Sequence, residues 1–226
     1  MQKRKIIIGT YDTAIAGLWT LTGWEFSDPE LKEEYVTVPG HDGDLDFSTV
    51  LTDGEPCYGN RSFVATLESS EGDRLEREAR IKAMVNELDG YKLHIVLPDD
   101  PNHYIVGRVR VARLYNDLAH ASVQVSAICE PWKYSATETV VGLEATETEQ
   151  TATLINAGRR SVIPTVKVIG GSVLLAFENE GEAIISQALS EGTYTLPDLY
   201  LRRGSMPLRY SGSGTILLTY REAVLQ

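Results

Sequence analysis

The sequence of 226 residues lacks most of the patterns that accompany catalysis. Its two cysteines, Cys57 and Cys129, are too few for a disulfide framework or a zinc site, so we expect buried free thiols. It contains no Gly-x-Ser-x-Gly, no His-Glu-x-x-His and no glycine-rich loop before a lysine; the run 211–214, Ser-Gly-Ser-Gly, has no glycine at the required offset. We therefore expect a protein that is not an enzyme, with no catalytic residue, no metal site and no cofactor.

The sequence also lacks an excess of positive charge. It has 21 Lys and Arg against 32 Asp and Glu, a formal net charge of −11. Because DNA, RNA and anionic lipid attract proteins through excess Lys and Arg, we expect no sequence-specific nucleic-acid binding and no membrane partner. The basic start of the chain is followed by only three isoleucines, Ile6 to Ile8, whereas a signal segment needs roughly 7–15 apolar residues. This pattern predicts synthesis in the cytoplasm without a targeting segment.

Two polar features could bear chemistry, and both have a plainer interpretation. Asp42, Asp44 and Asp46 alternate as at the start of a calcium loop, but Phe47 stands where glycine is needed and Asp53 where a bidentate glutamate is needed. We interpret this stretch as a polar loop. His94 falls within an apolar run, which favours a structural imidazole. The many carboxylates leave glycoside hydrolysis open, although no pair is indicated.

The first part of the chain predicts short strands and one helix. Runs rich in Val, Ile, Thr and Tyr, bounded by Gly, Pro, Asp and Asn, predict strands over residues 5–8, 18–24, 35–38, 62–67, 92–97, 104–114 and 119–128. Apolar residues spaced three and four apart predict an amphipathic helix over 73–88, with Leu75, Ala79, Ile81, Met84, Val85 and Leu88 on its apolar face. Asp73 and Glu76 form a capping box, and Gly90 ends the helix.

Prolines punctuate this first part. Residues 97–102 combine two prolines with two aspartates and predict a hairpin tip. Pro131, beside Trp132 and Tyr134, is expected to end the strand before it, because proline cannot donate to a sheet ladder. The composition then changes to Ser, Ala, Thr and Glu. We predict two domains, residues 1–135 and 136–226, with a linker over 135–149.

The second domain is predicted to be an antiparallel β-sandwich, because short strands and turn signals recur regularly. The predicted strands cover residues 151–156, 162–169, 172–177, 182–187, 192–196, 199–201, 206–210 and 214–220. Small sandwiches often bind sugars through an exposed tryptophan, but all three tryptophans, Trp19, Trp24 and Trp132, precede the linker. A carbohydrate-binding module that recognises host cell-wall sugars stays an alternative, and a wall-degrading hydrolase is a third.

Five motifs in order resemble the distal tail protein (Dit) family of long, non-contractile-tailed bacteriophages and their prophages. The five are Val38-Pro39-Gly40-His41-Asp42-Gly43-Asp44-Leu45-Asp46, then Tyr58-Gly59-Asn60-Arg61, then a helix that ends before Gly90, then Leu97-Pro98-Asp99-Asp100-Pro101-Asn102-His103-Tyr104 followed by Gly107-Arg108-Val109, and finally Cys129-Glu130-Pro131-Trp132-Lys133-Tyr134. The resemblance covers residues 1 to about 135 best. His41 departs from it, since a basic residue, often arginine, is expected there.

The resemblance implies a structural baseplate hub. It implies a mainly β chain, whose N-terminal β-sandwich or split-barrel-like domain has one α-helix and forms a hexameric ring, and whose C-terminal sandwich is galectin-like. The implied partners are the tail tube protein, the tail-tip or tail-associated protein, and receptor-binding or other baseplate proteins, at the tip of the virion tail. DNA would pass through the ring, and acidic residues lining the bore would repel it. We expect the hairpin around 98–101 and the strands beside it to contact neighbouring subunits.

Overall fold

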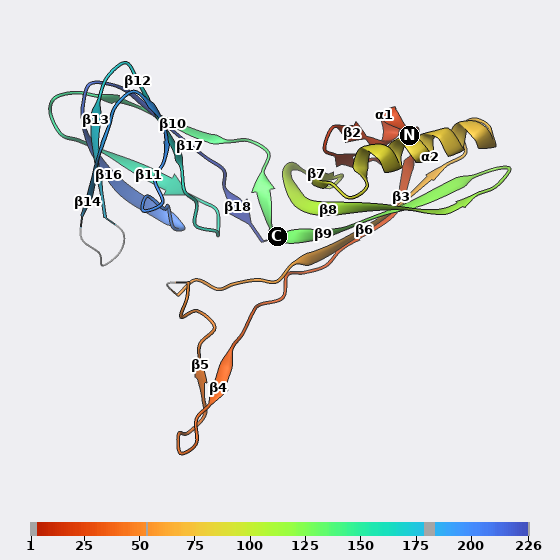
Figure 1. Ribbon diagram of the computed structural model, residues 1–226, viewed down its shortest axis with the longest axis horizontal. Coiled ribbons are helices and arrows are strands. Elements are labelled where there is room, and N and C mark those ends of the chain that lie inside the picture. The colour runs from red at the N-terminus through yellow and green to blue at the C-terminus, as the bar shows by residue number, and fades with distance from the viewer. Residues whose placement is uncertain (1–3, 53, 179–183, 226) are drawn as a thin grey trace. The chain divides into compact units, whose positions relative to one another are not determined.

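The computed structural model describes residues 4–52, 54–178 and 184–225 of the chain. It divides the chain into two compact units, Met1–Lys133 and Tyr134–Gln226, so the division falls two residues before the predicted boundary. Each unit has its own cluster of buried hydrophobic residues and is described by itself. Most of the regular structure is β-strand, which confirms the predicted fold class (Figure 1).

One curled sheet forms most of the first unit, with the strand order β2-β1-β7-β8-β9-β6-β3 (Figure 1). These strands are β1 (Ile7–Ile8), β2 (Tyr11–Asp12), β3 (Thr20–Phe26), β6 (Arg61–Ser69), β7 (Lys92–Leu97), β8 (Asp100–Asn116) and β9 (Ala121–Ser135). The predicted strands thus form, with shifted ends, and the short β2 was not predicted. A single curled sheet fits the split-barrel-like alternative of the prediction.

The predicted helix is α2 (Arg74–Leu88), which packs against β8. Asp73 caps its N-terminus and the capping box with Glu76 is present, as predicted. The buried stripe is Arg77, Ile81, Met84 and Leu88, whereas Leu75 is 79 % exposed. The predicted apolar face was therefore wrong at its N-terminal end, where a buried arginine takes the place expected for leucine. A second helix, the four-residue α1 (Thr13–Ala16), was not predicted.

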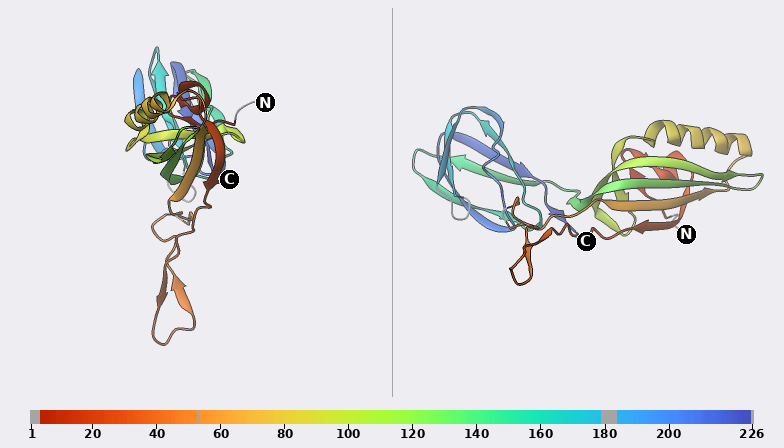
Figure 2. Two further views of the ribbon diagram at one scale, coloured as in Figure 1. Left: turned by 90° about the vertical axis from the view of Figure 1, so that its right-hand side faces the viewer. Right: turned by 60° about the horizontal axis from the view of Figure 1, so that its bottom comes forward.

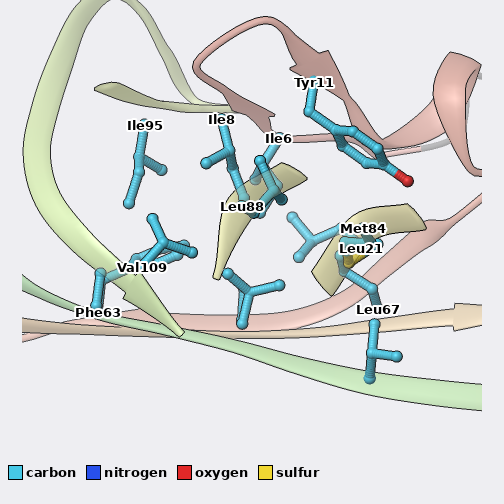
Figure 3. Packing of buried hydrophobic residues seen from close by; sticks show 14 of the residues in the cluster. Ile6, Ile8, Tyr11, Leu21, Phe63, Leu67, Met84, Leu88, Ile95 and Val109 are labelled. Carbon is cyan, nitrogen blue, oxygen red and sulfur yellow. The ribbon is translucent and has the colours of Figure 1, made fainter. Parts of the chain in front are cut away.

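The core of the first unit lies between α2 and the concave face of the sheet (Figure 3). Strand β6 shows how the alternation builds it, because Phe63, Ala65 and Leu67 are fully buried while the residues between them are not. Met84 and Leu88 of the helix meet these side chains in the same cluster. At roughly 25 cal/mol per Å² of buried apolar surface, such packing is the main stabilising term of the unit.

Residues between β3 and β6 leave the sheet and form a two-stranded sheet of their own, β4 (Tyr35–Thr37) and β5 (Asp44–Asp46) (Figures 1 and 2). Tyr35 pairs with Asp46 and Thr37 with Asp44. Strand β4 was predicted and β5 was not, because alternating aspartates are rare in strands.

The second unit is a sandwich of two four-stranded antiparallel sheets, ordered β10-β17-β12-β15 and β11-β16-β13-β14. The strands of these two sheets are β10 (Thr139–Ala145), β11 (Gln150–Asn156), β12 (Thr165–Ile169), β13 (Val173–Phe177), β14 (Ile185–Leu189), β15 (Gly192–Thr195), β16 (Gly204–Gly212) and β17 (Gly214–Tyr220). A further short strand, β18 (Ala223–Val224), belongs to neither sheet. One buried cluster joins both sheets, so the predicted sandwich is confirmed. Predicted residues 199–201 form only an isolated bridge, between Leu201 and Val162. The start of predicted strand 182–187 lies outside the described residues.

Two predictions made from prolines and polar composition are wrong. Strand β9 continues through Pro131 to Ser135. Its pairing with β6 ends at Cys129, opposite Arg61, so the missing N–H of Pro131 removes no bond to that strand. The expected linker 135–149 contains β10, which pairs with β17 over its whole length from Thr139 to Ala145. Its alternation of half-buried and exposed residues is typical of a strand. The glutamate and threonine within it make an apolar alternation hard to recognise from the sequence.

The run Ser-Gly-Ser-Gly at 211–214 joins the two sheets of the sandwich. Gly212 and Gly214 have φ of 125° and 100°, and a Cβ on Gly212 would lie 2.3 Å from the carbonyl oxygen of Ser172. Only glycine fits such a close approach of two backbones. The motif is thus required by the crossing from β16 to β17.

Among the described helices, none is long and apolar enough to cross a membrane.

Candidate assembly surfaces

The most unusual surface of the molecule is the segment between β3 and β6, residues 28–60, which we call the arm. It contains 9 of the 32 acidic residues and 1 of the 21 basic residues of the chain, a net charge of −8. The remaining 193 residues carry 23 acidic and 20 basic residues, a net charge of −3. The acidity of the protein is therefore concentrated in one short segment.

The arm also exposes large apolar side chains. The exposed residues are Leu31, Tyr35, Val36, Val38, Phe47, Val50 and Leu51, and their exposed fractions run from 36 % to 97 %. An isolated two-stranded sheet has no second layer that could cover such side chains. Negative charge accompanies them: Glu33 and Asp46 raise the pKa of Tyr35. The arm is therefore both acidic and rich in exposed apolar side chains.

The aspartates considered for calcium lie in the β4–β5 hairpin of the arm, and their oxygens are used within it. Thr37 Oγ1 donates to Asp44 Oδ1 at 2.7 Å. The backbone N–H of Ser48 donates to Asp46 Oδ1 at 2.8 Å, and bonds from Ser48 hold the pKa of Asp46 below its ordinary value. Within the described residues, no three His, Cys, Asp or Glu side chains are grouped to hold a metal ion. Asp53 lies outside the described residues.

The base of the arm is fixed by Arg61, a residue of the second family motif. Its side chain is 3 % exposed, Nε donates to the Ser27 carbonyl oxygen at 2.5 Å, and the guanidinium lies 3.6 Å from the centre of the Phe26 ring. Burial lowers the pKa of Arg61, and the charge of Asp28 opposes this shift. This contact ties together the residues that enter and leave the arm.

Further bonds extend this attachment by several residues. The N–H of Lys32 donates to the Cys57 carbonyl oxygen at 2.9 Å, and the N–H of Gly59 donates to that of Glu30 at 2.8 Å. Tyr58 packs edge-on against Trp132 with ring centres 5.6 Å apart. Two family motifs that are far apart in the sequence therefore meet here, which the spacing alone did not predict. The arm has an ordered base and an exposed hairpin.

A second surface is the face of the curled sheet opposite α2. It contains an open groove of about 630 Å³ at the centre of β6, β7, β8 and β9. The groove is lined by Val64, Val106, Arg108, Arg110, Ser126 and Ile128, with Lys92 and Glu130 at one side. Ile128 is 67 % exposed. The predicted half-buried strand is confirmed here, since Arg108 and Arg110 point outward while Val109 is fully buried.

A third surface is the turn between β8 and β9, where Leu118 is 91 % exposed. The buried side chain of Arg77 holds this turn: Nη2 donates to the carbonyl oxygens of Asp117 and Leu118 at 2.8 and 3.1 Å, and Nη1 donates to that of Gly72 at 2.5 Å. No local pattern indicates this role, because an arginine in a helix normally lies on the solvent-exposed face.

The titratable groups considered from sequence are dispersed. His94 is exposed and stacks on Tyr104 with ring centres 4.2 Å apart. Burial raises the pKa of Cys129 to about 12, and Cys57 is half-buried; both are free thiols, as expected. His103 and Lys133 bond to Asp100 at 2.7 and 3.0 Å. Burial acts to raise the pKa of Asp100, but the bonds from His103 and Lys133 together outweigh it and hold this pKa below its ordinary value.

The second unit offers little for a sugar to stack on. Phe177, Tyr210 and Tyr220 are buried in its core, and Tyr194 and Tyr200 are half-buried. The outward face of β13 and β14 carries small or aliphatic residues such as Leu174, Ala176 and Ala188. A flat face of this kind suits contact with another protein better than a sugar ring, which favours an exposed aromatic.

Comparison with known proteins places the fold. No family model matches the sequence, and no curated protein matches it. Solved structures do match the fold. One is the crystal structure of SPP1 Dit (gp 19.1), described as a paradigm of the hub adsorption apparatus in phages that infect Gram-positive bacteria. The match has a TM-score of 0.69 and 14% identity, and it covers 97% of this chain and 99% of that one. The resemblance inferred from the motifs is confirmed at the level of the fold.

Proposed function

We propose that this protein is a structural hub of a non-contractile phage tail. In this proposal identical copies close into a ring, a hexamer, between the tail tube and the tail-tip protein. The first units form the ring, and the second units bind receptor-binding or other baseplate proteins. No side chain makes or breaks a covalent bond. The protein is made in the cytoplasm of the bacterial host and works at the tip of the virion tail.

The observation that carries the proposal is the fold likeness to SPP1 Dit over nearly the full length of both chains. A likeness limited to one small sandwich would say little, because such sandwiches serve many functions. Here the likeness includes the curled sheet with its helix as well as the second unit.

The arm supports self-assembly independently of that likeness. Contiguous exposed apolar surface on a folded protein usually marks an interaction site. Seven exposed large apolar side chains within the arm, whose base is ordered by Arg61, fit a segment that is covered in an assembly.

The experiment is to purify the full chain and measure its mass in solution by light scattering, and then to image it by negative-stain electron microscopy. One copy is 25.0 kDa, so a hexamer has a mass of about 150 kDa and appears as an annulus. If the protein stays at the mass of one copy, both at high concentration and after mixing with its tail tube and tail-tip proteins, the ring is contradicted.

A further inference from the structure

Most of the positive charge of the second unit lies in two short loops. Arg159 and Arg160 lie in the loop after β11, and Arg202 and Arg203 directly precede β16. These four residues, which we call the arginine corner, are four of the seven basic residues of Tyr134–Gln226. The rest of this unit has three basic and ten acidic residues, a net charge of −7.

Backbone hydrogen bonds hold the two loops side by side. Val162 and Leu201 exchange both of their backbone bonds, at 3.0 and 2.7 Å. In an antiparallel pair of this kind, the register places Arg160 opposite Arg203, two positions further along each segment. Asn156, which is 1 % exposed, strengthens the pairing, because its Nδ2 donates to the carbonyl oxygens of Arg160 and Leu201 at 2.9 Å. The four arginines therefore share one corner of the sandwich.

The loop that carries Arg159 and Arg160 is also fixed in shape. The N–H of Gly158 donates to Asn156 Oδ1 at 3.0 Å, and the N–H of Arg159 donates to the Ala223 carbonyl oxygen at 2.7 Å. A Cβ on Gly158 would lie 2.8 Å from backbone atoms of Ala223, so only glycine lets the loop pack this close to β18. A loop that is already ordered loses less conformational entropy when a ligand binds to it.

The two facing arginines keep their charge and most of their donors. Arg160 Nη1 donates to the Tyr134 hydroxyl at 2.6 Å, which orients the guanidinium without neutralising it. Arg203 is exposed, and neither Arg160 nor Arg203 forms an ion pair with a described residue. The carboxylate of Glu222 borders the loop, where it accepts a bond from the N–H of Ala157 at 3.2 Å. Since a guanidinium has five N–H donors, both side chains retain several for a ligand.

We propose that the arginine corner binds the phosphate groups of a flexible, non-nucleotide polymer that has a phosphodiester in each repeat. The guanidinium fork matches phosphate oxygens bidentately. A tetrahedral phosphate presents its oxygens in several directions, so guanidinium groups from both loops reach it together. A planar carboxylate is filled by one such fork, which would leave the facing arginine without a partner.

The surroundings of the corner select against nucleic acid. Duplex DNA is stiff and has one negative charge per about 1.7 Å, so the net charge of −7 on the rest of the unit repels it. Single strands gain affinity by stacking their bases on exposed aromatic side chains, which the second unit largely lacks. A flexible polymer with spaced phosphates contacts the corner and keeps the rest of its length away from the acidic surface.

The proposed function indicates where such a polymer is met. A protein at the tip of a phage tail approaches the surface of the host cell, where anionic polymers are exposed to it. The binding itself does not depend on ring formation, so the two proposals fail separately.

The first test measures binding of the full chain to poly(glycerol phosphate) by isothermal titration calorimetry at physiological salt. Arg160→Gln with Arg203→Gln should raise the Kd about tenfold or more, because two charge-assisted contacts are lost. Lys167→Gln with Arg209→Gln, two exposed cations on β12 and β16, is the matched control and should change the Kd less than about twofold. Equal effects of the two double variants, or no binding by the wild type, would overturn the inference.

A single substitution separates lost binding from misfolding. Arg203→Gln removes no side-chain bond to a described residue, so the fold of the second unit should be unchanged. We expect this variant to raise the Kd about threefold while its circular dichroism and unfolding midpoint match the wild type. An unchanged Kd for this variant would contradict the pairing of Arg160 with Arg203 at one phosphate.

The second test locates the site by chemical footprinting. Phenylglyoxal modifies exposed arginine side chains, and mass spectrometry measures the modification of each one with and without poly(glycerol phosphate). The polymer should protect Arg160 and Arg203 and leave Arg209 reactive. Protection of Arg108 and Arg110 in the groove of the first unit, with the corner still reactive, would overturn the inference.

Light scattering of the same samples keeps this inference distinct from the proposed ring. Protection of the corner in a protein that stays at the mass of one copy supports the inference and contradicts the ring. A ring whose corner is not protected does the reverse.

The third test compares other polyanions in the same calorimetric assay. Poly-glutamate, a single-stranded oligonucleotide and duplex DNA should each bind at least about tenfold more weakly than poly(glycerol phosphate). If poly-glutamate binds as tightly, the corner fits an acidic segment of a protein. If either nucleic acid binds as tightly, the corner fits nucleic acid. Each of these two results would overturn the inference.

Discussion

The arm and the curled sheet of the first unit use similar residues in opposite ways. In the sheet, Phe63 and Leu67 are fully buried because α2 supplies a second layer. In the arm, Phe47 is 43 % and Leu51 97 % exposed, since two strands alone have no layer over them. The comparison teaches that the number of layers, and not residue hydrophobicity, decides which apolar side chains stabilise this fold and which remain available for a partner.

Two arginines of the first unit are buried, and each holds one segment of the chain in place. Arg61 fixes the base of the arm, and Arg77 fixes the turn between β8 and β9. Burying a cation costs desolvation free energy. Replacing that cation by an apolar side chain is also costly, because it leaves its buried hydrogen-bond partners unpaired. Both arginines donate hydrogen bonds to backbone carbonyl groups that lie outside the helices and strands.

The largest effect is expected for Arg77→Met. Methionine keeps much of the volume but leaves the carbonyl oxygens of Gly72, Asp117 and Leu118 without their donor. We expect the free energy of unfolding of the first unit to fall by about 3 kcal/mol. Tryptophan fluorescence during urea unfolding measures this unit alone, because all three tryptophans precede Tyr134.

Arg74→Met is the matched control for this substitution, because Arg74 is exposed on the first turn of the same helix. Its effect should stay within about 0.5 kcal/mol. Equal effects of the two substitutions would show that Arg77 contributes only helix propensity. This result would contradict its role in holding the turn between β8 and β9.

The next effect is a test of packing around Trp19, between α1 and β3. A Cβ on Gly17 would lie 2.0 Å from Trp19 Cδ1, whereas a Cβ on Gly23 meets nothing within 4 Å. Gly17→Ala should therefore destabilise the first unit by about 2 kcal/mol through overpacking, and Gly23→Ala should be nearly neutral. The same urea titration compares the two. If Gly17→Ala is neutral as well, the buried indole of Trp19 is free to move and this part of the core is loosely packed.

The fold was predicted where the pattern was local. The capping box at Asp73 and the alternation around Val109 need only neighbouring residues, and both were right. The exposure of the arm's apolar side chains could not be predicted, because exposure depends on whether another layer covers the hairpin. The positions of Arg77 and of the Tyr58–Trp132 pair depend on contacts between distant segments. The continuation of β9 through Pro131 was not predicted, because the residue at which β6 stops pairing with β9 cannot be inferred from the residues around Pro131.

A smaller effect is expected for Asp100→Asn at the start of β8, close to the turn after β7. The carboxylate accepts bonds from His103 and Lys133, and its pKa lies below the ordinary value of 3.8. A lowered pKa in the folded state adds stability above the unfolded-state pKa, and this stability is lost as the pH falls through the folded-state pKa. We expect a loss of about 1 kcal/mol at pH 7 that shrinks below pH about 4.

Urea titrations of wild type and variant at several pH values measure this difference, with the exposed neighbour Asp99→Asn as control. A difference that grows as the pH falls would have the wrong sign and would contradict the role of Asp100.

The smallest effect on stability should come from Leu51→Ser in the arm. Its side chain is 97 % exposed, so its removal takes no apolar surface out of the core, and the free energy of unfolding should change by less than about 0.5 kcal/mol. At concentrations where the protein assembles, the same substitution should weaken assembly if the arm is covered by a neighbour. The Arg77→Met variant is the positive control, since the fluorescence assay should detect its loss in the free energy of unfolding. A loss above 1 kcal/mol for Leu51→Ser in the monomer would mean that the arm packs on its own chain, because a side chain exposed in both folded and unfolded states contributes nothing to their difference.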